Sequence, residues 1–203
     1  MKLYLVRHGQ TDMNKEKLYY GWTDCPINEL GRKQAETLHG FFKNVEYQKV
    51  ITSDLKRSVE TAEIITRGKN IVLDKREAFR ELNFGLWEGK HYKVLKQEYP
   101  EAFEEWGKDW KNFCIPEGEA FFTFYERIRK ELQKVIEETP EEESVLLVTH
   151  NGVMSTMLCI LTGAGYDGFG KFFLEQETYS LVSVKNGFVI IEKINCPVKS
   201  CDF

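Results

Sequence analysis

The 203-residue sequence predicts a three-layer α/β fold, in which helices cover both faces of one sheet. Two observations support this prediction. Segments 2–7 and 144–149 are short apolar runs that are typical of buried strands, and each is followed by a histidine. Between and after these runs, strand-like segments alternate with segments whose apolar residues recur at helical spacing.

Length and composition indicate one globular domain over residues 1–203. The chain has 42% hydrophobic and 30% charged residues, which suffices for a sizeable core. Its formal net charge of −4 argues against nucleic acid as a partner, because nucleic-acid-binding domains usually present a basic face. Any site for an anion is therefore expected to be local.

Cysteine usage and hydropathy indicate a cytoplasmic protein. The five cysteines are odd in number, scattered and without a C-x-x-C pair, so we expect reduced thiols. The first apolar run reaches Arg7 too soon for a signal peptide, and segment 153–161 is too short to cross a bilayer. We therefore expect neither membrane insertion nor processing.

The first half of the chain contains three predicted strands and two predicted helices. After the strand at 2–7, a polar loop runs to Asn28, and a helix is expected from Leu30. Its predicted inner face consists of Leu30, Ala35, Leu38 and Phe42. Segment 49–52 is a predicted strand, Ser53 and Asp54 are predicted caps of the next helix, and 71–73 is a third strand.

In the second half, the pattern changes at about residue 76. From there to 118 aromatic residues are dense and helices are expected to be short, which indicates an insertion that covers one end of the sheet as a lid. A long helix is predicted over 119–138 and a strand over 145–149. Two further strands are expected around Asn186-Gly187, a dipeptide that favours a type I′ hairpin turn.

Cationic and imidazole side chains follow several of the predicted strands. Arg7 and His8 follow the first strand, Arg57 lies one turn into a helix, and His150 precedes Asn151 at the start of another helix. Arginine forks match phosphate oxygens, and a helix N-terminus favours an anion. The expected ligand is a phosphoryl group.

His8 has the chemistry of a nucleophile in this setting. A neutral imidazole nitrogen can attack phosphorus in line and form a phosphohistidine, which water then hydrolyses. The departing alkoxide needs a proton donor, and the loop at 80–89 offers Glu81 and Glu88 in aromatic surroundings that can raise a carboxyl pKa. Spacing alone leaves both carboxyls open.

Four motifs together resemble the histidine phosphatases, the family that includes cofactor-dependent phosphoglycerate mutases. The resemblance covers nearly the whole chain. Its motifs are RHG at 7–9 with the following QT and Asn14, GWTD at 21–24 with Pro26 and Leu30-Gly31, SDLKRS at 53–58 with Thr61-Ala62, and THNG at 149–152. This resemblance implies a mostly parallel sheet flanked by helices.

The resemblance also implies roles for individual residues. His8 would be the phosphorylated nucleophile and Glu81 the proton donor, with His150 as a further catalytic residue. The implied phosphate-binding residues are Arg7, Arg57, Asn14 and Asn151. Asn151 stands where many acid-phosphatase relatives carry an acidic donor, which shifts that role to Glu81. Neither a metal nor another cofactor is implied.

Segments 81–89 and 116–121 resemble most the branch that acts as α-ribazole 5′-phosphate phosphatases in cobalamin nucleotide-loop assembly. A broad-specificity phosphatase and a phosphoglycerate mutase stay open as alternatives, as does, more remotely, a non-catalytic phosphate-binding module. Gly21, Trp22 and Thr23 are candidate substrate contacts, although a loop anchored by Trp22 would look the same. The aromatic cluster fits core and lid packing or a stacking pocket. The expected partner is a small phosphate monoester, and a homodimer stays open.

Overall fold

A six-stranded sheet forms the centre of the computed structural model, which describes residues 1–198. Its order is β4-β3-β6-β1-β7-β8, and the first four of these strands run parallel. β7 pairs antiparallel with β1, and β8 antiparallel with β7. The strands are β1 (Lys2–Arg7), β3 (Lys49–Thr52), β4 (Leu73–Lys75), β6 (Ser144–Thr149), β7 (Thr178–Lys185) and β8 (Phe188–Pro197).

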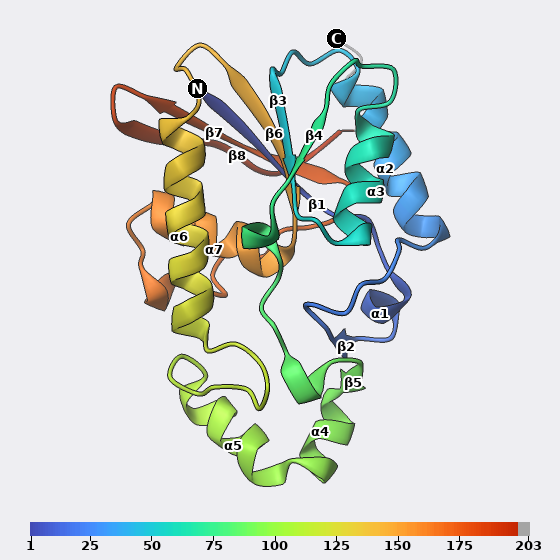
Figure 1. The fold of residues 1–203 in the computed structure, drawn as a ribbon, viewed down its shortest axis with the longest axis vertical. Coiled ribbons are helices and arrows are strands. Elements are labelled where there is room, and N and C mark those ends of the chain that lie inside the picture. Colours follow the sequence, from blue (N-terminus) through green and yellow to red (C-terminus); the bar gives the residue numbers. More distant parts are fainter. Residues whose placement is uncertain (199–203) are drawn as a thin grey trace.

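Helices cover both faces of this sheet (Figure 1). One layer contains α2 (Glu29–Phe42) and α3 (Lys56–Ile65), and the other contains α6 (Phe121–Glu137) and α7 (Asn151–Leu161). This arrangement confirms the predicted α/β fold with a mostly parallel sheet.

The alternation of side chains along β6 explains the continuous apolar run. Val145 and Leu147 belong to the core under α6 and α7, whereas Leu146 and Val148 belong to the core under α2 and α3. All four side chains are fully buried. A parallel strand that is covered on both faces has no polar side, so its sequence reads as an unbroken apolar run.

The segment between β4 and α6 forms a separate small core. It contains the 3-10 turns η1 (Glu77–Phe79) and η2 (Gly85–Trp87), the strand β5 (Lys90–His91), and the helices α4 (Tyr92–Glu98) and α5 (Pro100–Asp109). Trp87 lies fully buried at its centre, stacked on Phe113 and edge-on to Trp106. Figure 1 shows α4 and α5 at the end of the molecule opposite the N-terminus.

Three short elements complete the fold. α1 (Asp12–Lys15) follows β1, β2 (Leu18–Tyr19) pairs with β5 in a two-stranded sheet, and η3 (Tyr166–Gly168) follows α7. β2 thereby connects the loop after β1 to the aromatic segment.

Several local predictions need correction. α3 begins at Lys56, and neither Ser53 nor Asp54 caps it, because its N-cap is Leu55, without a side-chain hydrogen bond. Asp54 instead forms an ion pair with Arg80. β4 begins at Leu73, two residues later than expected. Leu30, in the first turn of α2, is 47% exposed and does not belong to the inner face that was predicted for this helix.

The C-terminal hairpin is as predicted. Asn186 and Gly187 join β7 to β8, and both have positive φ angles, of 50° and 76°. A type I′ turn needs positive φ at both central positions, which asparagine and glycine tolerate.

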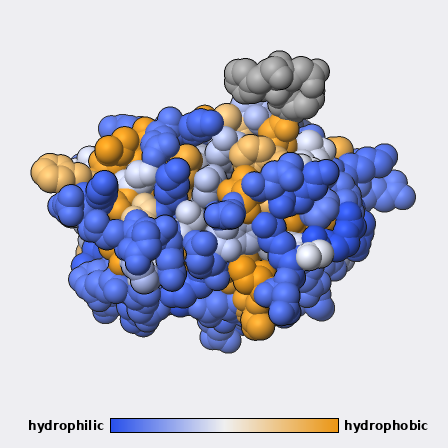
Figure 2. All heavy atoms as spheres, turned by 90° about the horizontal axis from the view of Figure 1, so that it is seen from above, coloured by the Kyte–Doolittle hydropathy of each residue, from blue (hydrophilic) through white to orange (hydrophobic). Residues whose placement is uncertain are grey.

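Figure 2 shows the molecule from above, turned by 90° from Figure 1. The surface on this side is mostly hydrophilic, with hydrophobic residues scattered among hydrophilic ones. Within residues 1–198, no helix has the length and apolar character needed to cross a membrane. Cys25, Cys114, Cys159 and Cys196 are free thiols, and Cys201 lies outside the described residues.

Candidate functional site

The two predicted histidines meet at one edge of the sheet. Arg7, the last residue of β1, pairs with Thr149, the last residue of β6, so the residues that follow both strands leave the sheet side by side. The ring centroids of His8 and His150 are 5.1 Å apart. Both rings are buried and line a cavity of about 330 Å³.

His8 presents an unprotonated nitrogen to this cavity. Its Nδ1 lies 2.8 Å from the carbonyl oxygen of Gly9, and a carbonyl can only accept, so Nδ1 carries the hydrogen. Nε2 therefore keeps its lone pair. Burial, followed by the charges of Arg57 and Arg7, lowers the pKa of His8 well below its usual value of 6.5. The imidazole is neutral and able to act as a nucleophile.

His150 has the opposite polarity. Its Nδ1 accepts a hydrogen bond from Nε of Arg57 at 3.2 Å, so the hydrogen resides on Nε2. That nitrogen is buried and has no hydrogen-bond partner among residues 1–198. Burial and the neighbouring Arg57 also lower the pKa of His150. A buried donor without an acceptor indicates a place for a ligand oxygen.

The guanidinium group of Arg57 is fully buried at the start of α3. Besides the bond to His150, Nη1 donates to the carbonyl of Thr23 at 2.9 Å and Nη2 donates to the carbonyl of Gly21. The ring of Tyr20 lies 4.7 Å from its centre. Because an arginine has five N–H donors, Arg57 retains two for a ligand.

Arg7 supplies a second cation from the end of β1. Its Nη1 donates to the carbonyl of Leu174 at 2.9 Å. Its Nε is buried and lacks a partner within the described chain. An orphaned guanidinium donor beside an orphaned imidazole donor indicates an anion site.

Two amide side chains complete this polar end. Oδ1 of Asn14 accepts from the backbone of Thr11 and from Nε2 of Gln176, both at 3.2 Å. Oδ1 of Asn151 accepts from the backbone of Leu174 at 2.8 Å. Since each oxygen is occupied, each NH₂ group remains to donate. Both residues line the cavity.

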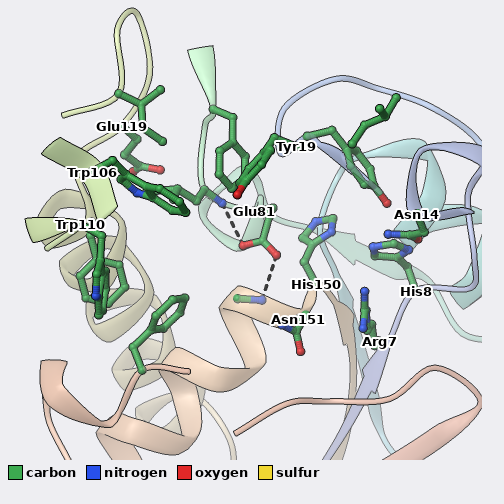
Figure 3. A pocket seen from close by; sticks show the side chains of 18 of the residues that line it. Arg7, His8, Asn14, Tyr19, Glu81, Trp106, Trp110, Glu119, His150 and Asn151 are labelled. Carbon is green, nitrogen blue, oxygen red and sulfur yellow. Dashed lines mark hydrogen bonds between the residues drawn. The ribbon is translucent and has the colours of Figure 1, made fainter. Parts of the chain in front are cut away.

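Glu81 lies between the polar end of the cavity and its aromatic end (Figure 3). Oε2 accepts from the backbone of Gly152 at 2.9 Å, and Oε1 accepts from that of Leu82 at 3.0 Å. Burial raises the pKa of this carboxyl above its usual 4.5, although the two hydrogen bonds oppose the shift. A raised pKa favours the protonated form that a general acid needs.

Glu88, the other carboxyl that the sequence left open, lies elsewhere. It is absent from the cavity lining, and its oxygens accept hydrogen bonds from the backbone of residues 21–23. The structure thus distinguishes the two carboxyls, because only Glu81 faces the cavity.

Gly21, Trp22 and Thr23, the candidate substrate contacts, are also absent from the lining of this cavity. The carbonyls of Gly21 and Thr23 point at Arg57. The Trp22 indole donates to the carbonyl of Glu81 at 3.0 Å and packs under Arg80. Segment 21–23 thus forms hydrogen bonds to Arg57 and to the backbone of Glu81 from outside the cavity.

The far end of the cavity is aromatic (Figure 3). Its lining comes from β2, from the segment after β4, and from the loops near α6 and α7. These aromatic residues are Tyr19, Phe84, Trp106, Trp110, Phe113, Phe121 and Phe169. Glu119 joins them and forms an ion pair with Arg127 at 2.8 Å. One cavity thus has a cationic end and an apolar end.

Sequence reasoning did not identify Arg127 or Gln176. Arg127 donates to the carbonyls of Ala78 and Arg80 at 2.8 and 2.9 Å and fixes the chain that leads to Glu81. An arginine on an amphipathic helix resembles any solvated helix residue, so the sequence held no signal for it. Within residues 1–198, no three His, Cys, Asp or Glu side chains are grouped to hold a metal ion.

Comparisons with known proteins agree with this geometry. The family model of the histidine phosphatase superfamily (branch 1) matches residues 3–197. An adenosylcobalamin/α-ribazole phosphatase from Salmonella typhimurium is 30% identical over 195 residues, 96% of either chain. Phosphoserine phosphatase 1 from Hydrogenobacter thermophilus is 29% identical, over 96% of this chain and 92% of its own. The crystal structure of the α-ribazole phosphatase from Shigella flexneri superposes with a TM-score of 0.92, at 29% identity over 96% of each chain.

Proposed function

Because the chain belongs to branch 1 of the histidine phosphatase superfamily and is a phosphatase, we propose that it forms a phosphohistidine at His8 and that its substrate is α-ribazole 5′-phosphate. The phosphohistidine is supported by the two imidazoles, because the hydrogen is on Nδ1 of His8 but on Nε2 of His150. The aromatic end of the same cavity supports the proposed substrate.

In the first half of the reaction, the lone pair of His8 Nε2 forms a bond to phosphorus. The bond between phosphorus and the ester oxygen breaks in line with it, and Glu81 transfers its proton to that oxygen. The alcohol then leaves. The donors of Arg7, Arg57 and His150 stabilise the negative charge on the phosphoryl oxygens.

In the second half, Glu81 is ionised and accepts a proton from water. The water oxygen bonds to phosphorus, the bond to His8 Nε2 breaks, and inorganic phosphate is released. The imidazole regains its lone pair and the carboxyl its proton. Because the carboxyl must work in both forms, a pKa raised toward neutral suits it.

The two chemically different ends of the cavity support the proposed ester. Its phosphate would bind at the cationic end, and its benzimidazole would lie against the aromatic residues near Trp106 and Trp110. The names of relatives at about 30% identity support this assignment, since they match over nearly the whole chain.

The test is phosphate release from four esters. α-Ribazole 5′-phosphate is compared with phosphoserine, 3-phosphoglycerate and p-nitrophenyl phosphate, with His8→Ala as the blank. We expect kcat/KM to be highest for the ribazole ester by at least tenfold. Similar values for all four esters would contradict the assigned substrate, and a transfer of phosphate within 3-phosphoglycerate would indicate a mutase.

The nucleophile is tested separately. After rapid mixing with ester and quenching in alkaline denaturant, the unaltered chain should retain a phosphoryl group that is stable in base and lost in acid, and His8→Ala should retain none. Turnover by His8→Ala at the unaltered rate would refute the phosphohistidine.

A further inference from the structure

The carboxylate of Glu88 has an unusually complete set of partners. It accepts from the backbone N–H groups of Gly21, Trp22 and Thr23 at 2.8 to 3.0 Å. It also accepts from the Thr23 hydroxyl at 2.6 Å and from the backbone of Phe84 at 3.1 Å. Five donors around one carboxylate hold its position and charge firmly.

Two of these three residues also hold Arg57 through their carbonyl groups. While their N–H groups point to Glu88, the carbonyls of Gly21 and Thr23 accept from the two terminal nitrogens of the Arg57 guanidinium. The segment 21–23 therefore lies between a carboxylate and a guanidinium. The peptide group between Gly21 and Trp22 points its N–H to Glu88 and its carbonyl to Arg57.

Glu88 is itself anchored in the small aromatic core. The neighbouring Trp87 is fully buried there, and the N–H of Gly89 donates to the carbonyl of Tyr19 at 2.8 Å. The backbone of Gly21 packs tightly against that of Leu82, because a Cβ at Gly21 would lie 1.6 Å from the carbonyl oxygen of Leu82. Neither Glu88 nor segment 21–23 can shift without disturbing packed structure.

We propose that Glu88 is a positioning residue for Arg57. Through segment 21–23 it fixes the plane of the guanidinium, and so the direction of the two N–H donors that Arg57 retains and of the Nε donor to His150. The inference rests on the proposed function to the extent that Arg57 binds the phosphoryl group. It links the aromatic segment to the phosphate site by a defined chain of hydrogen bonds.

A double-mutant cycle tests this inference. The dissociation constant of inorganic phosphate is measured by calorimetry, which needs no turnover, for Glu88→Gln, Arg57→Ala and the double variant. Glutamine replaces one carboxylate oxygen by an NH₂ group that faces backbone N–H donors, so segment 21–23 must move. We expect Glu88→Gln to weaken phosphate binding about tenfold in the unaltered background and less than twofold in the Arg57→Ala background.

A merely structural role predicts something else. If Glu88 only stabilised the fold, its substitution would weaken phosphate binding by the same factor in both backgrounds, and this outcome would overturn the proposal. Glu131→Gln serves as the matched control, since Glu131 is buried and paired with Arg76 but does not line the cavity. It should lower the melting temperature without changing phosphate affinity.

Leaving-group dependence gives a second readout. Glu88→Gln should slow alkyl and activated aryl phosphates by equal factors, because it acts on phosphoryl binding. A selective loss on alkyl esters would mark Glu88 as a proton donor and contradict its positioning role.

Thr23→Val keeps the inference testable if Glu88→Gln does not fold. It removes only the hydroxyl donor to Glu88 and should weaken phosphate binding about threefold, again only where Arg57 is present. Unchanged affinity would overturn the proposal. If the unaltered chain binds no phosphate, the proposed function fails as well, whereas normal binding with equal losses in both backgrounds refutes only the role of Glu88.

Discussion

At the scale of single residues, the site depends on which nitrogen of each imidazole carries hydrogen. The Gly9 carbonyl fixes the proton of His8 on Nδ1, and Arg57 fixes that of His150 on Nε2. One ring can therefore donate an electron pair to phosphorus while the other donates a hydrogen bond to a phosphoryl oxygen. The two histidines are not interchangeable, although both are buried and neutral.

Glu81→Gln tests the proton donor. Glutamine retains the shape but has no acidic proton, so kcat for an alkyl phosphate should fall by about 10² to 10⁴. p-Nitrophenyl phosphate should lose much less, because its leaving group needs little protonation. Steady-state assays of both esters measure the difference, and equal losses would place the donor elsewhere.

The histidines also predict how stability depends on pH. Burial keeps the folded-state pKa values of His8 and His150 well below 6.5, so below this pH the unfolded chain binds more protons than the folded one. The free energy of unfolding should thus fall as the pH drops below 6.5, by about 1.4 kcal/mol per pH unit for each such histidine. Urea unfolding at pH 7.5 and 5.5 measures this decrease.

The variant His8→Asn provides the comparison for that experiment. It removes one of the two titrating groups, so the decrease between the two pH values should become smaller. An identical decrease in both proteins would show that His8 titrates normally in the folded state.

At the scale of elements, the first turn of α7 holds the carboxyl of Glu81. The N–H of Gly152 donates to Glu81, and a Cβ at residue 152 would lie 2.3 Å from Oε1 of Glu81. The absence of a side chain thus allows the carboxyl to reach the helix N-terminus, where the helix dipole favours an anion. A glycine at residue 152 is therefore required for the close approach of the Glu81 carboxyl, and not for a turn.

Gly152→Ala should therefore impair the reaction without weakening the helix. Alanine normally stabilises a helix relative to glycine by about 1 kcal/mol, but here its methyl group would displace Glu81. We expect a loss of kcat on alkyl phosphates of the same order as for Glu81→Gln. Gly40→Ala is the matched control, because nothing lies within 4 Å of a Cβ there and activity should not change.

At the scale of the whole molecule, the α/β sheet with its helices and the small core around Trp87 meet at the cavity. The sheet and its helices supply the polar residues, whereas the small core around Trp87 supplies much of the aromatic lining. β2 and β5 pair across this boundary, so the two parts are joined beside the site. The division suggests that phosphate binding and leaving-group recognition can be altered separately.

Trp110→Leu tests that separation. Trp110 packs against Phe121 and Phe169 in the aromatic end. Its loss should raise KM for α-ribazole 5′-phosphate about tenfold, or about 1.4 kcal/mol, and leave phosphate affinity unchanged. Phe41→Leu is the control, since Phe41 stacks on Tyr179 in the core on the α2 side of the sheet. Parallel losses of phosphate affinity would contradict the division.

Sequence alone determined the fold class and most of the polar site. Apolar runs and helical spacing are local patterns, and the motifs around His8, Arg57 and His150 lie at ends of elements, where topology brings them together. Local sequence gave no signal that Asp54 pairs with Arg80 and does not cap α3, because Arg80 lies 26 residues further along the chain.

Only the tertiary structure distinguished the positions of Glu81 and Glu88, since only Glu81 lines the cavity. The two carboxyls are seven residues apart in one aromatic loop, and no spacing rule separates them. Hydrogen bonds to residues far along the chain place one over the cavity and the other behind Arg57. The hydrogen bonds from Arg57 to the carbonyls of Gly21 and Thr23 were unpredictable for the same reason, since folding brings these partners together from distant parts of the chain.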